Sequence, residues 1–132
     1  MATRRTLFGC ALCAVTLGLT QTAAQAQTSG ITRTILQTTD LPGGTHVVVL
    51  ATAEIAPNIE VARHTHPGIE SSFMIEGECT IQVAGEADRT VKAGDSFQIP
   101  PSAVHGVKNG PRPSRFAITF TVEKGKPLAS PA

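Results

Sequence analysis

The chain of 132 residues contains no tryptophan and no tyrosine, and its aromatic content is only 4%. Proteins that bind single-stranded nucleic acid stack bases on aromatic side chains, and this sequence has few residues for such a platform. An excess of basic charge is also absent, because 11 lysine and arginine residues face 10 acidic ones and give a formal net charge of +1. We therefore expect no nucleic-acid partner.

Long apolar runs are absent except at the N-terminus. There a basic pair, Arg4-Arg5, precedes an apolar run over Leu7–Leu19 and a small-residue site at Ala24-Gln25-Ala26. This is the three-part pattern of a secretory signal peptide over residues 1–26, and the arginine pair resembles a twin-arginine export signal. The run is too short for a membrane anchor, which needs about 20 apolar residues. We expect a periplasmic or secreted protein that leaves the membrane after cleavage.

Cysteine is scarce, and two of the three cysteines, Cys10 and Cys13, lie in this N-terminal segment. Cys79 would remain alone after cleavage, so an internal disulfide is excluded. Cys79 alternates with Ile81 and Val83, which predicts a small buried side chain. A reactive or metal-binding thiol is the alternative.

Outside the N-terminal segment no window has the periodicity of an amphipathic helix. Glycine and proline separate short segments rich in β-branched residues, which predicts an antiparallel all-β sandwich or barrel. The predicted strands are Ile31–Gln37, His46–Ile55, Val61–His66, Ile69–Ile75, Cys79–Val83, Arg89–Lys92, Ser96–Ile99, His105–Lys108 and Ser114–Glu123. We expect Lys124–Ala132 to be a polar tail.

Four side chains suggest a metal site. His64 and His66 are two positions apart on a predicted strand, so both imidazoles can face one point. Glu70 can return to that point after the Pro67-Gly68 break, and His105 lies far along the chain. Such a mixed nitrogen and oxygen set suits Mn, Fe, Co, Ni, Cu or Zn, and leaves two positions of an octahedral ion open. Histidines that pack without a metal are the alternative.

Two stretches resemble the paired motifs of the cupin superfamily in its small single-domain form. The first stretch runs from Asn58 to Gly77 and the second from Gly94 to Asn109. The matching residues are His64, His66, Glu70, Gly77, Gly94, Pro100, His105 and Asn109. Asn58 and Ser102 replace glycines of the motifs, and both fall in turns.

The resemblance covers roughly Ile31–Glu123 and implies a double-stranded β-helix, or jelly-roll barrel. We expect the chain to form a single domain over residues 27–132, with a short N-terminal strand region. The resemblance also implies one divalent transition metal held by His64, His66, Glu70 and His105. Because the histidines must be neutral to bind it, we expect metal affinity to fall below about pH 6. A homodimer is expected from the resemblance alone.

The pocket beside the metal is less well defined by the sequence. Ser72 and Met74 share strand parity with Glu70 and could line it. Phe97, Ile99, Phe116, Ile118 and Phe120 could form its apolar wall, or all of these residues could be ordinary barrel core. Arg115 could bind an acidic substrate, although a surface position is the better expectation.

The resemblance implies a dioxygenase that acts on a small organic substrate with Fe, Ni, Cu or Mn. Glu70 would then serve as ligand and as general base. Two alternatives stay open: a non-redox isomerase or lyase that uses the metal as a Lewis acid, and a module that binds a metal or small ligand without turnover.

Overall fold

The computed structural model describes residues 29–132, so the predicted signal peptide lies outside the described residues. Every regular element in this part is a strand, and residues 29–132 contain no helix long and apolar enough to cross a membrane. The strands are β1 (Ile31–Asp40), β2 (His46–Ile55), β3 (Glu60–Thr65), β4 (Gly68–Glu76), β5 (Glu78–Val83), β6 (Arg89–Lys92), β7 (Ser96–Ile99), β8 (His105–Asn109), β9 (Ser114–Glu123) and β10 (Ser130–Pro131).

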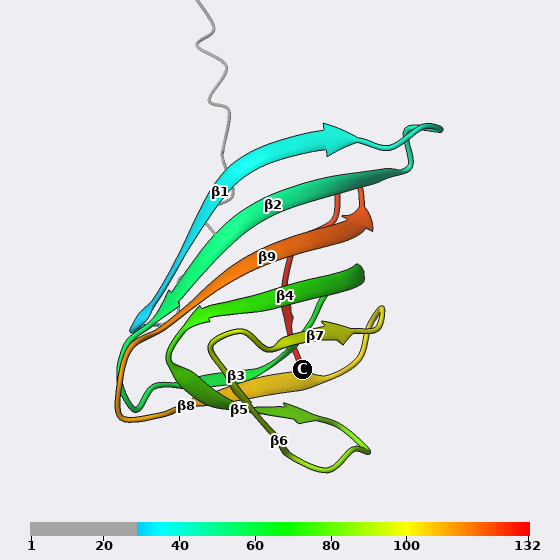
Figure 1. Cartoon of the computed structure of the whole chain (residues 1–132). Coiled ribbons are helices and arrows are strands. Elements are labelled where there is room, and N and C mark those ends of the chain that lie inside the picture. The colour runs from blue at the N-terminus through cyan, green and yellow to red at the C-terminus, as the bar shows by residue number, and fades with distance from the viewer. Residues whose placement is uncertain (1–28) are drawn as a thin grey trace, which may run out of the picture.

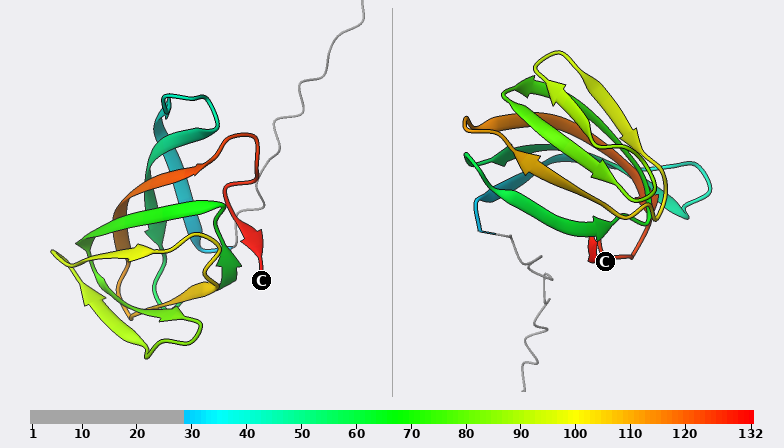
Figure 2. Two further views of the ribbon diagram at one scale, coloured as in Figure 1. Left: turned by 90° about the vertical axis from the view of Figure 1, so that its right-hand side faces the viewer. Right: turned by 90° about the horizontal axis from the view of Figure 1, so that it is seen from below.

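These strands form two antiparallel sheets that face each other (Figure 1). One sheet has the order β1-β2-β9-β4-β7 and the other β10-β3-β8-β5-β6. The chain passes from one sheet to the other several times, and Figure 2 shows the two layers from the side and from below. This is the antiparallel double-stranded β-helix that the sequence motifs imply, and its fold class is confirmed.

The core lies between the two sheets and comes from alternate residues of their strands. β9 supplies Phe116, Ile118 and Phe120, which are almost fully buried. Cys79 from β5 is buried in the same core, as predicted. Burial raises the pKa of the Cys79 thiol to about 12, so this side chain is an unreactive thiol that packs as an apolar group.

The C-terminal segment differs from its predicted form. Lys124–Ala132 is not a free polar tail, because Leu128 packs against the core and Ser130–Pro131 pairs with the end of β3. β3 would otherwise be an edge strand with unpaired backbone groups, which a short segment can satisfy. Two residues of strand are too few to show a period in the sequence.

The buried side-chain amide of Asn109 links β8 to the chain just before the turn at Asn58. Asn109 at the end of β8 donates from Nδ2 to the carbonyl oxygens of Ile55 (3.1 Å), Ala56 (2.8 Å) and Arg112 (3.1 Å). Its Oδ1 accepts a hydrogen bond from Ser114 Oγ at 2.5 Å. These bonds satisfy a side chain that is only 8% exposed, so the motif asparagine has a structural role.

The two residues that replace motif glycines both adopt positive φ. Asn58 has φ of 59° and Ser102 has φ of 60°. Glycine takes this conformation without strain, whereas other residues rarely adopt it. Both turns therefore keep the backbone conformation that glycine favours, although asparagine and serine occupy these positions.

Candidate metal centre

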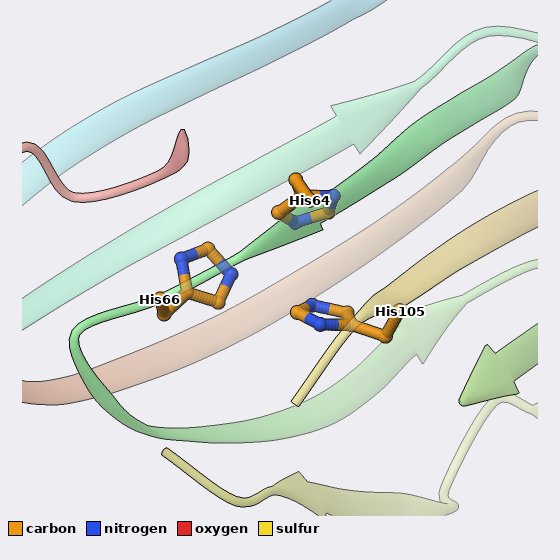
Figure 3. Close-up of side chains that lie close together, drawn as sticks. All are labelled: His64, His66 and His105. Atoms are coloured by element: carbon orange, nitrogen blue, oxygen red, sulfur yellow. The ribbon is translucent and has the colours of Figure 1, made fainter. Parts of the chain in front are cut away.

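The fold brings three histidines together from two adjacent strands. His64 lies near the end of β3, His66 follows that strand directly, and His105 begins β8. His64 and His105 are direct partners in the β3–β8 ladder. One nitrogen from each ring lies within 4.8 Å of the others, and Figure 3 shows the three imidazoles gathered around one space.

The other nitrogen of each ring is held by the backbone. A carbonyl oxygen can only accept, so each Nδ1 must carry the proton and donate it. The acceptors are Ala62 for His64 (2.9 Å), Leu128 for His66 (2.5 Å) and Ala103 for His105 (2.9 Å). In a neutral ring this leaves the lone pair on Nε2, the arrangement that metal-bound histidines use to fix tautomer and orientation.

Two of these Nε2 atoms are buried without a hydrogen-bond partner in residues 29–132, namely those of His66 and His105. Each lies close to Glu70 Oε2, at 2.9 Å from His66 and 3.3 Å from His105. With Nδ1 protonated, these nitrogens and the carboxylate oxygen all present lone pairs to one another. A proton on Nε2, which would let the ring donate to Glu70, or a metal ion among these atoms relieves the unfavourable contact. The donor set therefore fits a metal ion.

Glu70 comes from β4 and is 7% exposed. Its Oε1 accepts a hydrogen bond from Ser72 Oγ at 2.6 Å. Burial by itself raises the pKa of Glu70, but the neighbouring rings of His105 and His66 and the Ser72 hydroxyl outweigh it and hold the pKa below its usual range. The carboxylate is therefore ionised, as a metal ligand must be.

His64 is the most accessible of the three rings. Burial, the largest influence, lowers the pKa of His64 to about 4, although its bond to Ala62 acts in the opposite direction. The ring consequently stays neutral well below pH 6. Our expectation that protonation near pH 6 governs metal binding therefore does not apply to this ligand.

A cavity of about 50 Å³ opens beside the cluster. Its polar lining comes from Arg33, His64, Glu70, Ser72 and His105. The remaining lining side chains are apolar: Ile31, Ala53, Ile55, Val61, Phe97, Val107, Phe116, Ile118 and Phe120. The space accommodates only a few non-hydrogen atoms, because a single water fills roughly 10–15 Å³ of such a cavity.

The expected pocket residues divide into two groups. Ser72, Phe97 and Phe116 line the cavity, as do Ile118 and Phe120. Met74 and Ile99 are buried in the core but do not line the cavity. Arg115 is exposed and faces Glu54, with Nε and Oε1 3.8 Å apart, which is the surface position we preferred.

Two residues of the site, Arg33 and Leu128, were not predicted from the sequence. Arg33 lines the cavity from β1, and its alternation with the half-buried Ile31 was the one available signal. Leu128 provides the carbonyl for His66 from 62 residues further along the chain. No local pattern marks that contact.

Comparison with known proteins identifies the family. Residues 51–125 match the family described as Cupin domain. A search of curated proteins gave no match to this sequence.

Solved structures share the fold. An uncharacterized conserved protein with a double-stranded β-helix domain from Klebsiella pneumoniae is 27% identical, with a TM-score of 0.59, covering 80% of this chain and 90% of that one. An RmlC-like cupin from Shewanella frigidimarina is 23% identical, with a TM-score of 0.60 and coverage of 75% and 82%. The DMSP lyase DddQ from Ruegeria pomeroyi is 18% identical, with a TM-score of 0.63 and coverage of 77% and 51%. Because the family match extends over more than half of the sequence, from β2 through β9, this chain belongs to the cupin family.

Proposed function

We propose that this protein is an exported metal-dependent enzyme that acts on a small organic molecule. His64, His66, Glu70 and His105 would hold one divalent transition metal. The observation that carries the proposal is the pair of buried, unpartnered Nε2 atoms of His66 and His105 facing an ionised carboxylate. When bound, the ion supplies either redox chemistry with O₂ or Lewis-acid polarisation of the substrate.

A dioxygenase-like reaction is the first reading. The donor set suits redox-active Mn, Fe, Ni and Cu as well as Zn. The apolar cavity wall, formed by side chains such as Phe97, Phe116 and Ile118, would exclude water from the reacting groups. Among residues 29–132 no cysteine or methionine lines the cavity, so its wall lacks the sulfur side chains that oxidise readily.

A non-redox isomerase or lyase is the second reading, and Glu70 supports it. Its ionised carboxylate borders the cavity and could accept a proton from a substrate. The low pKa makes Glu70 a weak base while it contacts His66 and His105, so this role requires the carboxylate to leave those contacts. The DMSP lyase of the same fold adds no weight here, because 18% identity shows the fold alone.

The first experiment is elemental analysis of the protein exported by its own signal. We expect close to one transition metal ion per chain in the natural protein. His105→Ala should lose most of this metal, because the substitution removes one of the three histidine ligands. His46→Ala is the matched control, since His46 is exposed and the one hydrogen bond of its ring within the described residues is to Thr45 Oγ1. Full stoichiometry in His105→Ala would refute the ligand assignment.

The second experiment assigns the reaction. Substrate-dependent O₂ uptake that requires the bound metal would support the dioxygenase reading. Turnover of the zinc-loaded protein under anaerobic conditions would favour the isomerase or lyase. A protein that retains its metal and shows neither activity would be a binding module, and the enzymatic proposal would then be wrong.

A further inference from the structure

Arg33 is a charged residue on the inner face of the barrel. It lies on the edge strand β1 and pairs with the buried Ala53 of β2, so its side chain points between the sheets. Its guanidinium carbon lies 5.3 Å from the ring centroid of Phe120. The same ring packs against His66, with centroids 4.8 Å apart. Arg33 therefore reaches the wall of the metal-site cavity, which it lines together with His64, Glu70 and His105.

In the described part of the chain this guanidinium has no anionic partner. Within residues 29–132 Arg33 forms no ion pair, and its Nε is buried with no hydrogen-bond partner. Burial lowers the pKa of Arg33, and attraction to Glu70 only partly compensates. The Glu70 carboxylate is already engaged by Ser72 and two histidines. Since a partly buried guanidinium with a buried, unpartnered Nε–H is costly, the arginine is explained if its partner arrives with a ligand.

The cavity restricts what that ligand can be. Arg33 is its one fixed cation in the described part of the chain, and Ser72 is the only hydroxyl group that lines it. A phosphate dianion usually needs several donors, whereas one guanidinium binds one carboxylate through two parallel hydrogen bonds. With a divalent ion bound, Glu70 alone could not offset the positive charge of the ion and Arg33. The volume of about 50 Å³ restricts the buried part of the ligand to a few atoms.

We propose that Arg33 binds the carboxylate of the substrate, so that the substrate is a small organic acid held between Arg33 and the metal. This inference rests on the proposed function, because it takes the metal site as the place of reaction. Arg33 would set specificity: an amide or alcohol of the same shape cannot accept both guanidinium hydrogen bonds as an anion does. The Phe120 ring beneath the guanidinium would hold it in place.

The test measures binding of named probes to zinc-loaded protein. Lactate and pyruvate are titrated against lactamide, and affinities are read from NMR chemical shifts, with zinc content determined in every sample. Arg33→Met keeps an unbranched apolar side chain of similar length and removes the guanidinium that lies over Phe120, while Arg33→Lys keeps the charge without the planar fork. Arg115→Met is the matched control, because Arg115 is about half exposed and lies outside the cavity.

We expect the natural protein to prefer the carboxylates over lactamide. Arg33→Met should bind zinc normally but lose at least about tenfold in carboxylate affinity, with no change toward lactamide. Arg33→Lys should retain part of the preference, and Arg115→Met all of it. Equal carboxylate affinity in Arg33→Met, an equal loss in Arg115→Met, or no preference in zinc-loaded natural protein would overturn the proposal. Failure of the natural protein to bind zinc or any of the other proposed metals would instead refute the proposed function.

Discussion

Removal of residues 126–132 tests how the metal site is held together. This truncation deletes the Leu128 carbonyl, which accepts the Nδ1 proton of His66 at 2.5 Å. It also deletes the Leu128 side chain, which packs against the core, and the β10 pairing to β3. His66 would keep its place in the chain but lose the bond that fixes its tautomer and its ring orientation.

The expected loss can be estimated from each contact. Removing an outer partner of a metal-binding histidine typically lowers metal affinity 10- to 100-fold, or about 1.4–2.8 kcal/mol. Leu128 is only partly buried, so loss of its packing should cost about 1 kcal/mol of folding free energy, less than a fully buried leucine. The truncated chain should therefore fold and bind zinc weakly.

Two measurements separate these effects: zinc affinity by competition with a chelator, and the free energy of unfolding by urea in excess chelator. Leu128→Ala is the matched control, since it keeps the carbonyl and removes most of the side chain. We expect it to lose stability and to retain zinc affinity within a few-fold. The reasoning is refuted if the truncated chain binds zinc as tightly as the full chain, or if Leu128→Ala loses as much affinity as the truncation.

Three further predictions concern the fold and its pH dependence. Because burial lowers the folded-state pKa of His64 to about 4, only the unfolded chain gains this proton between about pH 6.5 and 4. The metal-free protein should lose stability as pH falls through that window, and urea unfolding of His64→Gln should show a shallower pH slope; an unchanged slope would contradict this. Gly68→Ala should destabilise the protein by more than about 3 kcal/mol, because the new Cβ would lie 2.1 Å from the carbonyl oxygen of Thr121. Thermal unfolding close to that of the natural protein would disprove the clash. Ser102→Gly should stabilise it by about 0.5–1 kcal/mol by relieving the positive φ of 60°, and a lower midpoint in urea would count against that strain.

The strands could be predicted because their signals are local. Glycine and proline mark the ends of β2, β6, β7 and β9, whose observed bounds match the predicted ones. β1 extends three residues beyond Gln37, past a bulge between Ile35 and Gln37. The bulge lies inside the predicted range, and the three added residues, 38–40, are polar and exposed, so no apolar alternation marks them.

The histidine cluster was also predictable, because strand parity aligns His64 with His66 and the second motif supplies His105. The sequence could not reveal the contacts that orient these rings. Leu128 acts through its backbone carbonyl, which any residue has, so its identity gives no signal. Arg33 is partly buried only in the folded barrel, and one arginine in a strand whose other residues are exposed, apart from Ile31, resembles a surface residue.

The three carbonyl acceptors differ in how they are positioned, and this difference has a consequence for assembly. Ala62 and Ala103 each precede their histidine by two residues, so His64 and His105 are oriented once β3 and β8 pair. His66 is oriented only when the C-terminal segment docks, since its acceptor is 62 residues away. Metal binding by His66 should then favour the docked segment, and docking should favour metal binding by the same factor, as linkage requires. The C-terminal segment is therefore a structural part of the candidate metal centre, although none of its side chains is among the proposed ligands.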